Sequence, residues 1–541
     1  MNDWSPSPET QEGKRLSSKA VARLAVLTSV VALSIGACGT VSPTATPSVA
    51  PTVSSASPAA APTATPTAGP CVAPTFGPND TPRGKSGQII NIGGPPHTIV
   101  RWYVGLGPGE DPAQIALQQT VVNDFNVLQD KRTDGVEPIL LSLEIVQNDQ
   151  AVDILKAEIA SCNAPDLIGP VDIKGRASLP GEFLDMTQLI ARAGYDMTRY
   201  PPALVNTMKD GLTGALLGLP YAVYPSYIFY NRDIFDAAGL KYPPQKVGDD
   251  YEMPGGARVP WNWGTVRNIA MKLSLDTHGR NATQAGFDPT SQTQFGFEFQ
   301  WTEGRRLASA FGSGSFVAAD KKTAQFPDDW KTAWTWYYNG IWRDHFIAND
   351  AQRNSDLLAK GNVLSSGHAA MGHMFQWYIC CMSAGGMAPG AFKRWDIAVM
   401  PANGAGIVTA PTDVDTFVID RNTLAAPQAF EAMAYLMSRM DLLAIYGGTP
   451  ATGDRLRFYR DNVDPPLAKE FPGNVVDWQV ALDMEGYAES PNNQASLPND
   501  AKATADADKI FSTLAKTPGL DVDQIFTDVT TALQADFDAA T

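Results

Sequence analysis

Cysteines are the residues whose types and positions most constrain the chemistry of this chain. There are five: Cys38, Cys71, Cys162, Cys380 and Cys381. Cys38 directly follows an apolar run, where its thiol could accept a lipid. The other four allow three disulfide pairings in an oxidising compartment. A bond between the adjacent Cys380 and Cys381 would close a strained small ring. Two alternatives remain for them: a disulfide with a distant cysteine such as Cys162, or buried free thiols.

Motifs of the common catalytic classes are missing from the sequence. It contains no His-Glu-x-x-His, no Gly-x-Ser-x-Gly, no Walker loop and no Cys-x-x-Cys pair. Gly105, Gly107 and Gly109 approach a dinucleotide-binding pattern, but Glu110 stands where the next glycine is required. We therefore predict no metal, no cofactor and no catalytic residue. Two carboxylates that the fold brings together could still form a glycosidase site, which sequence alone does not exclude.

Tryptophan is dense in one part of the chain. Eight of the twelve tryptophans lie within fewer than 120 residues, between Trp261 and Trp377. A pyranose stacks its C–H faces on aromatic rings and hydrogen-bonds its hydroxyls to Asp, Asn or Arg side chains. We interpret Trp330 and Trp334 as part of a buried stripe, because they repeat at helical spacing. Trp301 and Trp377 lie outside such stripes, which makes them candidates for a sugar pocket.

The N-terminal residues have the pattern of an export signal. Basic residues precede an apolar run of 14 residues, LAVLTSVVALSIGA, over 24–37. The run is shorter than the roughly 20 residues that span a bilayer. It ends in Ile35-Gly36-Ala37-Cys38, which resembles the lipobox of bacterial lipoproteins, where the cysteine carries diacylglycerol. We predict that 1–37 is a cleaved signal peptide and that Cys38 is lipidated, the alternative being an ordinary signal peptide with an incidental cysteine.

The remaining chain divides by composition. Residues 38–85 are rich in Pro, Thr, Ser and Ala, so we predict an extended, disordered spacer. Residues 86–541 are too many for one ordinary core and predict two lobes. The net charge of −16 argues against a nucleic-acid partner. No later apolar run reaches membrane-spanning length, so we expect a protein anchored by lipid to the cell membrane and facing outside the cytoplasm.

Strand and helix patterns alternate through the globular part. This alternation, with short Gly/Pro turns, predicts an α/β sheet covered by helices. The expected strands are 98–104, 138–146 and 167–169, with another inside 214–240. The expected helices are 115–128, 151–160, 261–273, 328–346, 425–443 and two pieces within 504–540.

Four stretches, taken in order, resemble the sugar-binding, maltodextrin-binding-protein-like family of extracellular solute-binding proteins of ABC importers. The second is the most specific. Two segments depart from the family pattern: an insertion at 245–260 and the long portion after Asp454. The four stretches are Ala164-Pro165-Asp166-Leu167; Gly218-Leu219-Pro220 with Phe229-Tyr230-Asn231-Arg232-Asp233-Ile234-Phe235; Gly367-His368-Ala369-Ala370-Met371; and Thr412-Asp413-Val414-Asp415-Thr416-Phe417.

The resemblance implies a two-lobed periplasmic-binding-protein-like fold of type II, whose lobes close on a ligand about crossing hinge segments. By analogy, the chain would cross near 222–226, 411–416 and 447–452. Lobe 1 would comprise about 86–222 and 412–448. Lobe 2 would comprise about 223–411 and 449–541.

The resemblance and the aromatic pattern together predict the binding residues. We expect Tyr224, Trp301 and Trp377 to act as stacking platforms, and Asp172 and Asp413 to accept hydroxyl hydrogen bonds. The predicted protein is a monomeric receptor without catalysis. It would capture a sugar or oligosaccharide and deliver it to the permease subunits of an ABC importer.

Two other functions are compatible with the sequence. A receptor of the same fold could bind a polyamine, an osmolyte or another small solute, and a cationic ligand would require several carboxylates around an aromatic box. A surface-anchored polysaccharide-degrading enzyme would require two cleft carboxylates about 5 to 10 Å apart, one with a raised pKa.

Overall fold

A computed structural model describes residues 89–90, 96–299, 303–382 and 393–540. All of them lie within one compact unit of the chain, Thr65–Thr541. The predicted signal peptide, Cys38, Cys71, the whole predicted spacer and Trp301 lie outside the described residues. Within the described ranges, none of the helices combines the length and apolar character needed to cross a membrane.

A ten-stranded mixed sheet organises the fold. Its main path runs β1-β2-β4-β13-β5-β11-β10, with β3 beside β2 and with β12 and β14 beside β5. Two small two-stranded sheets lie apart from it: β6 (Tyr251–Glu252) with β7 (Arg258–Val259), and β8 (Leu275–Asp276) with β9 (Gln292–Gln294). The strands of the large sheet are β1 (Ile89–Ile90), β2 (His97–Val104), β3 (Ile139–Ile145), β4 (Leu167–Val171), β5 (Ala222–Asn231), β10 (Glu298–Phe299), β11 (Met371–Phe375), β12 (Trp395–Ala398), β13 (Thr412–Ile419) and β14 (Thr449–Pro450).

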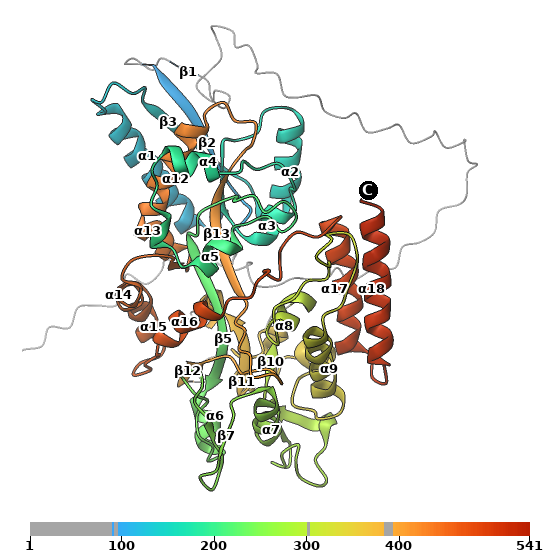
Figure 1. The fold of residues 1–541 in the computed structure, drawn as a ribbon. Helices are drawn as coiled ribbons and strands as arrows, with labels where there is room; N and C mark the ends of the chain where they lie inside the picture. The colour runs from blue at the N-terminus through green and yellow to red at the C-terminus, as the bar shows by residue number, and fades with distance from the viewer. Residues whose placement is uncertain (1–88, 91–95, 300–302, 383–392, 541) are drawn as a thin grey trace, which may run out of the picture. The chain divides into compact units, whose positions relative to one another are not determined.

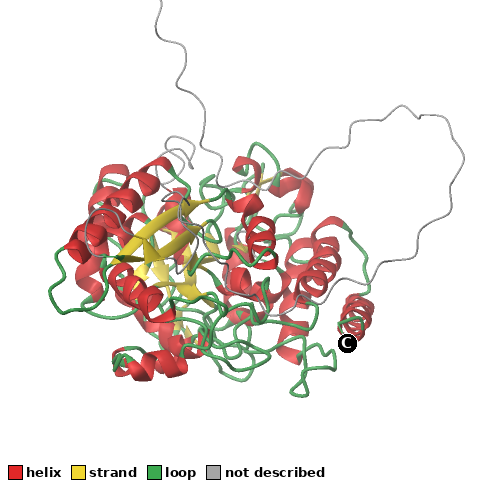
Figure 2. Ribbon diagram, turned by 90° about the horizontal axis from the view of Figure 1, so that it is seen from above, coloured by secondary structure: helices red, strands yellow, loops and turns green. Residues whose placement is uncertain are grey.

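Helices lie on both sides of the strands (Figure 2). The predicted α/β architecture is therefore confirmed. The α-helices of four residues or more are α1 (Pro112–Asp130), α2 (Asn148–Ala160), α3 (Ile173–Ala177), α4 (Thr187–Arg192), α5 (Pro202–Thr207), α6 (Arg232–Ala237), α7 (Trp263–Leu273), α8 (Gly304–Ser309), α9 (Asp328–Trp342), α10 (Asp350–Arg353), α11 (Ile379–Met382), α12 (Ala426–Ser438), α13 (Met440–Ile445), α14 (Arg455–Phe458), α15 (Asp464–Glu470), α16 (Gln479–Met484), α17 (Asp500–Lys516) and α18 (Val522–Asp538).

The first core surrounds the parallel strands β2, β3 and β4. Alternate residues of β2 point to opposite faces of the sheet. Trp102 packs into the larger cluster, with Phe125 of α1 and Met433 of α12, whereas Tyr103 packs into a smaller cluster with Leu155 of α2. Burial on both faces explains why this strand is an almost continuous apolar run in the sequence.

The second core lies around the other half of the sheet. It gathers most of the aromatic residues, including Trp263 of α7 and the fully buried Trp330 and Trp334 of α9. The predicted buried stripe at 330–334 is thus confirmed. The C-terminal helices α17 and α18 pair with each other and pack against α8 and α9 (Figure 1), so part of the portion after Asp454 completes this core.

Two long strands connect the cores. β5 begins with Ala222 and Tyr224 in the first core and ends with Tyr227 and Tyr230 in the second. Its first half pairs with β13 and β14 and its second half with β11 and β12. Along the chain, core membership changes again between Ala410 and Val414, where β13 begins.

Two details differ from the sequence prediction. The helix expected over 425–443 is two helices, because Arg439 is extended between α12 and α13. Its guanidinium pairs with Asp124 and Asp441, contacts that apolar periodicity does not reveal. The insertion 245–260 contains the short antiparallel pair β6 (Tyr251–Glu252) and β7 (Arg258–Val259).

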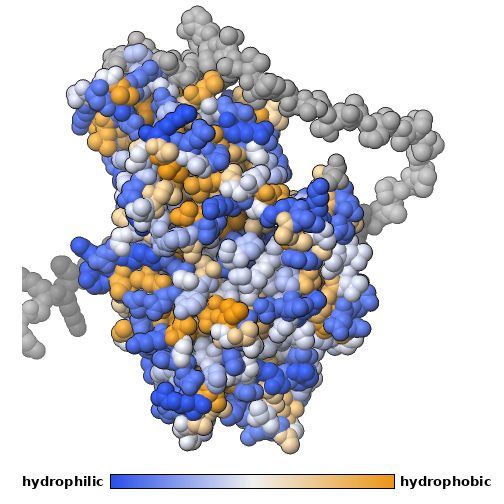
Figure 3. All heavy atoms as spheres, in the orientation of Figure 1, coloured by the Kyte–Doolittle hydropathy of each residue, from blue (hydrophilic) through white to orange (hydrophobic). Residues whose placement is uncertain are grey.

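The surface and the cysteines add two observations. Figure 3 shows a face on which small apolar patches alternate with polar residues. Cys162, directly after α2, is disulfide-bonded. The side chains of the other four cysteines lie outside those that the structure describes.

Candidate ligand site at the strand crossing

Asp413 lies at the centre of a polar cluster where β13 meets β5. It pairs across the two strands with Tyr224 and is only 5% exposed. Arg306 of α8 forms an ion pair with it, with 3.1 Å between Nη2 and Oδ2. The Trp377 side chain also hydrogen-bonds Asp413. We call Asp413, Arg306, Trp377 and Gln494 the Asp413 site.

Gln494 enters this site from the C-terminal portion of the chain. With its amide oriented to satisfy both neighbours, it donates to Asp413 Oδ1 at 3.2 Å and accepts from Arg306 Nε at 2.9 Å. Arg306 also pairs with Glu303 at 3.3 Å between Nε and Oε2. The carboxylate, guanidinium and amide therefore form a linked set of donors and acceptors.

An aromatic face borders the same groups. Trp377 is partly buried and lies parallel to Phe375, with ring centroids 6.0 Å apart. The Arg306 guanidinium lies 5.1 Å from the centroid of Phe375. Aromatic rings beside hydrogen-bonding side chains are what a sugar or another polar ring requires.

Asp172 and Lys174 approach the site from the first core. Asp172 is partly exposed and caps α3, where its Oδ1 accepts from Gly175 N at 2.6 Å. Its charge acts on both Asp413 and Arg306. Lys174, in the next turn, reaches Glu303 at 3.3 Å between Nζ and Oε1. Residues that pack with the two cores therefore meet at this point.

Asp415 and Tyr224 lie behind Asp413, inside the sheet. The single proton of the Tyr224 hydroxyl has two acceptors within reach: Asp415 Oδ2 at 3.4 Å and the carbonyl oxygen of Tyr446 at 3.3 Å. Tyr224 itself belongs to the first core and is 5% exposed. The buried guanidinium of Arg176 donates to the carbonyl of Thr207 at 3.1 Å.

Burial controls the ionisation of the acids. It raises the pKa of Asp413 to about 6, although Arg306 acts to lower it. It raises the pKa of Asp415 well above its usual value, with Asp172 and Asp413 adding to the effect. Burial would also raise the pKa of Glu303, but Arg306 and Lys174 lower it below its usual value.

Glu489 extends the cluster on the side of the C-terminal portion. Its carboxylate accepts from the backbone N–H of Thr412 at 3.0 Å and from Asn492 Nδ2 at 3.0 Å. Burial raises its pKa to about 7. Glu489 therefore holds the start of β13 in place beside Asp413.

The structure brings four of the five predicted ligand residues into one region: Asp172, Tyr224, Trp377 and Asp413. Trp377 and Asp413 touch, and Asp172 acts on Asp413 through its charge. Tyr224 is buried with its hydroxyl occupied, so its stacking role remains a prediction. Trp301 lies outside the described residues.

Sequence reasoning missed several residues of the cluster. Glu303 and Arg306 follow shortly after Trp301 in the sequence. Charged residues so close to a candidate stacking residue were the one local sign that they belong to the site. Asp415 lies two residues after Asp413, and the two-residue period of a strand places both side chains on one face. Gln494 and Glu489 had no local signal, because only the fold brings them to β13.

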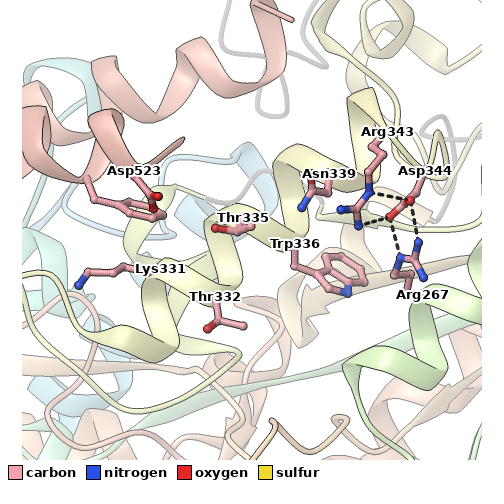
Figure 4. Close-up of a pocket in the computed structure, with 10 residues that line it drawn as sticks. Arg267, Lys331, Thr332, Thr335, Trp336, Asn339, Arg343, Asp344 and Asp523 are labelled. Carbon is pink, nitrogen blue, oxygen red and sulfur yellow. Dashed lines mark hydrogen bonds and ion pairs between the residues drawn. The ribbon is translucent and has the colours of Figure 1, made fainter. Parts of the chain in front are cut away.

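A separate pocket of 370 Å³, which we call the outer pocket, lies along α9 and is also lined by residues of α7 and α18 (Figure 4). It is lined by Lys331, Thr335, Trp336 and Asn339 along that helix. Beside them, Asp344 is held by Arg267, with 2.6 Å between Nε and Oδ2. None of the four predicted ligand residues that the structure describes lines this pocket.

The described side chains form no group of three or more His, Cys, Asp or Glu residues with metal-binding geometry. Asp413 faces a guanidinium, an indole and an amide rather than further metal ligands. The cluster can bind and orient a polar solute through hydrogen bonds and ring contacts.

The chain matches one protein family and resembles many solved structures. The family of bacterial extracellular solute-binding proteins matches residues 121–452, more than half of the chain. No curated protein sequence matches the chain.

Solved structures resemble the chain over most of its length. A Listeria monocytogenes ABC substrate-binding protein in complex with cycloalternan is 18% identical, with a TM-score of 0.56, and the match covers 82% of this chain and 98% of the other. UspC of M. tuberculosis is 18% identical, with a TM-score of 0.58 and coverage of 82% and 100%. The sugar-binding protein MalE of Xanthomonas citri is 14% identical, with a TM-score of 0.57 and coverage of 82% and 98%. These likenesses confirm the two-lobed α/β fold.

Proposed function

The chain belongs to the bacterial extracellular solute-binding proteins, and on that basis we propose that it captures a sugar or oligosaccharide between two lobes. The Asp413 site carries the proposal. It combines a carboxylate, a guanidinium, an amide and a partly exposed indole where the two cores meet. One structural neighbour is described as a sugar transporter and another as a sugar-binding protein, which supports the same ligand class.

The charges of the cluster favour a neutral ligand over a polyamine. Five acids lie in it, but burial raises the pKa of Asp415 well above its usual value and that of Glu489 to about 7. At neutral pH these two are therefore wholly or partly protonated. The remaining acids are Asp172, Glu303 and Asp413, which face the cations Lys174, Arg176 and Arg306. Such a balance provides no net attraction for a polycation.

The contacts of Asp413 also favour binding over hydrolysis. A glycosidase acid must present its proton to the leaving group. Asp413 instead faces Arg306, Trp377 and Gln494 and is almost fully buried. We infer that it positions other groups and does no proton transfer.

A thermal-shift screen of the purified protein tests the ligand class. The panel contains mono- and oligosaccharides, polyamines and amino acids at millimolar concentration. A bound ligand stabilises the fold by RT ln(1 + [L]/Kd), so a micromolar ligand raises the melting temperature measurably. We expect a sugar to raise it. A shift with a polyamine alone would contradict the proposal, and release of cleaved glycan would indicate an enzyme.

We also propose that lobe 1 comprises the first core and lobe 2 the second, with crossings in β5 and at the start of β13. Closure of the lobes on a ligand would then bend these strands. A ligand found by the screen should reduce the radius of gyration in small-angle X-ray scattering. An unchanged radius with bound ligand would argue against hinge closure.

The lipid anchor at Cys38 is a further part of the proposal. The apolar run and the small residues before Cys38 support it. In a bacterial host, the wild type should sediment with membranes and Cys38→Ser should not. Equal membrane association of both would contradict lipidation at this position.

The partner of an anchored receptor would be the permease of an ABC importer. The family and the description of several neighbours as ABC substrate-binding proteins support this role. Deletion of the protein should abolish uptake of its ligand at concentrations near Kd. Unchanged uptake together with loss of a transcriptional response to the ligand would point to sensing instead.

A further inference from the structure

A second polar pocket, of 320 Å³, lies beside the Asp413 site. We call it the Asn206 pocket. One wall is formed by Ile173 and residues 206–214, which adjoin the first core, and the other by residues 489–495 of the C-terminal portion. The second wall lies outside the stretch 121–452 that matches the family. Its volume is at the lower end of small-molecule sites, which suits one ring.

The Asn206 pocket and the Asp413 site are neighbours on two separate elements. Ile173 lines the pocket and directly follows Asp172. Asn492 lines the pocket, and Gln494, two residues on, contacts Asp413 and Arg306. Glu489 lines the pocket as well, and it interacts electrostatically with Asp413 and Arg306, so the pocket and the site lie next to each other.

Two buried ionisable side chains, Glu489 and Arg176, join the pocket to the site. Glu489 lines the pocket while its carboxylate accepts from Thr412 N, the residue before Asp413. Arg176 donates to the carbonyl of Thr207, another lining residue, and its charge interacts with Asp172 and Asp415. These contacts fix the spacing between the two binding regions.

The two walls also touch each other. Ser496 Oγ donates to Asp210 Oδ2 at 3.1 Å. Gly211 packs so closely on the opposite segment that a Cβ would lie 3.0 Å from the Cβ of Ala495. The pocket is therefore closed at this end, and a ligand in it would contact both walls at once.

The lining suits a ring that carries hydroxyls. The pocket exposes Asn206, Lys209 and Ser490, whose amide, ammonium and hydroxyl groups serve as donors and acceptors. Lys209 Nζ donates to Asn206 Oδ1 at 3.0 Å, which orients the pair. Ile173 and Pro491 supply apolar surface. The charge of Lys209 is matched by the adjacent Asp210.

We propose that the Asn206 pocket is a second sugar subsite, and that the ligand is an oligosaccharide of at least two rings rather than a monosaccharide. This inference rests on the proposed function. One ring binds at the Asp413 site and the next in the Asn206 pocket. The C-terminal segment 489–495 then selects ligand length.

Isothermal titration calorimetry of the purified protein tests the subsite. The probes are the best monosaccharide of the screen and the di- and trisaccharides built from it. We expect the disaccharide to bind at least tenfold more tightly, which is about 1.4 kcal/mol. The double variant Asn206→Ala/Lys209→Ala should remove this gain and leave monosaccharide affinity unchanged. Asn339→Ala in the outer pocket is the matched control and should alter neither affinity.

The outcomes separate the two proposals. Equal affinity for mono- and disaccharide overturns the subsite but leaves the sugar receptor intact. A loss of affinity in the double variant that is the same for both ligands also overturns it. Failure of every sugar to bind overturns the sugar receptor and the subsite together.

Discussion

Replacing Arg306 by Met should destabilise the protein by an amount that grows with pH. Arg306 lies 3.1 Å from Asp413 Oδ2 and 3.3 Å from Glu303 Oε2, and its side chain is only 10% exposed. Removing one partner of a buried ion pair leaves a charge without compensation and costs about 3–5 kcal/mol. Asp413→Asn should cost less, about 1–3 kcal/mol, because Arg306 keeps Glu303 as its partner.

The pH dependence follows from the carboxyl of Asp413. With Arg306 present, the pKa of Asp413 is raised to about 6 by burial. Without the guanidinium it rises further, so near pH 5 the carboxyl is neutral in both proteins and the cost is smallest. At pH 8 the wild type holds a paired carboxylate, whereas the variant must keep the carboxyl protonated. Each unit by which the pKa of Asp413 rises in the variant adds about 1.4 kcal/mol to the stability difference between wild type and variant at high pH.

Urea unfolding at pH 5, 6.5 and 8 measures the effect, with circular dichroism confirming that the variants fold. The double variant Arg306→Met/Asp413→Asn should lose the added pH dependence. Arg267→Met is the matched control, because Asp344 remains bound by Arg343. A cost of Arg306→Met that is equal at pH 5 and pH 8, or smaller than that of Asp413→Asn, would refute the reasoning.

Three further predictions follow from the same contacts. Trp330→Ala should lower the unfolding free energy by about 3–5 kcal/mol, because the residue is fully buried, and should leave ligand affinity unchanged. A loss of affinity at unchanged stability would contradict a role in the core. Burial raises the pKa of Glu298 to about 7, so its contribution to stability is full below pH 4.5 and lost as pH rises through 7. Unfolding free energy should therefore fall less between pH 5 and 8 in Glu298→Gln than in the wild type, and an equal or steeper fall would contradict this. Lys174→Ala should cost less than about 1 kcal/mol, because Lys174 and Glu303 are 53% and 34% exposed. Lys174→Ala should also weaken ligand binding more at low salt than at high salt. A loss of affinity that is independent of salt would count against the Lys174–Glu303 ion pair as a link between the lobes.

The strands and helices that form the cores were predictable because their burial leaves a period in the sequence. Apolar runs gave β2 and β3, and helical spacing gave α9. The break between α12 and α13 at Arg439 was not predictable. Apolar residues continue on both sides of Arg439, and its ion-pair partner Asp124 is distant in sequence. Local patterns report which face is buried, and they do not report where a helix must bend.

The candidate site was predictable only where a family motif marked it. Asp413 lies in one of the stretches that carry the family resemblance, whereas Trp377 lies shortly after another and was singled out because it is outside the helical stripes. Arg306 lies 107 residues before Asp413, and Gln494 lies far after it in the C-terminal portion, so no local spacing connects them. Tyr224 shows the converse limit, because a strand buried on every side has no alternation to show which way a ring points.

Tryptophan fluorescence tests the central claim, that a sugar binds at the Asp413 site. The purified wild type, Trp377→Phe and Trp336→Phe are titrated with the sugar that gives the largest thermal shift. Trp336 lies in the outer pocket and serves as the matched control. We predict saturable quenching in the wild type and in Trp336→Phe, and at least tenfold weaker binding in Trp377→Phe. Equal loss in both variants, or unaltered binding in Trp377→Phe, would contradict the claim.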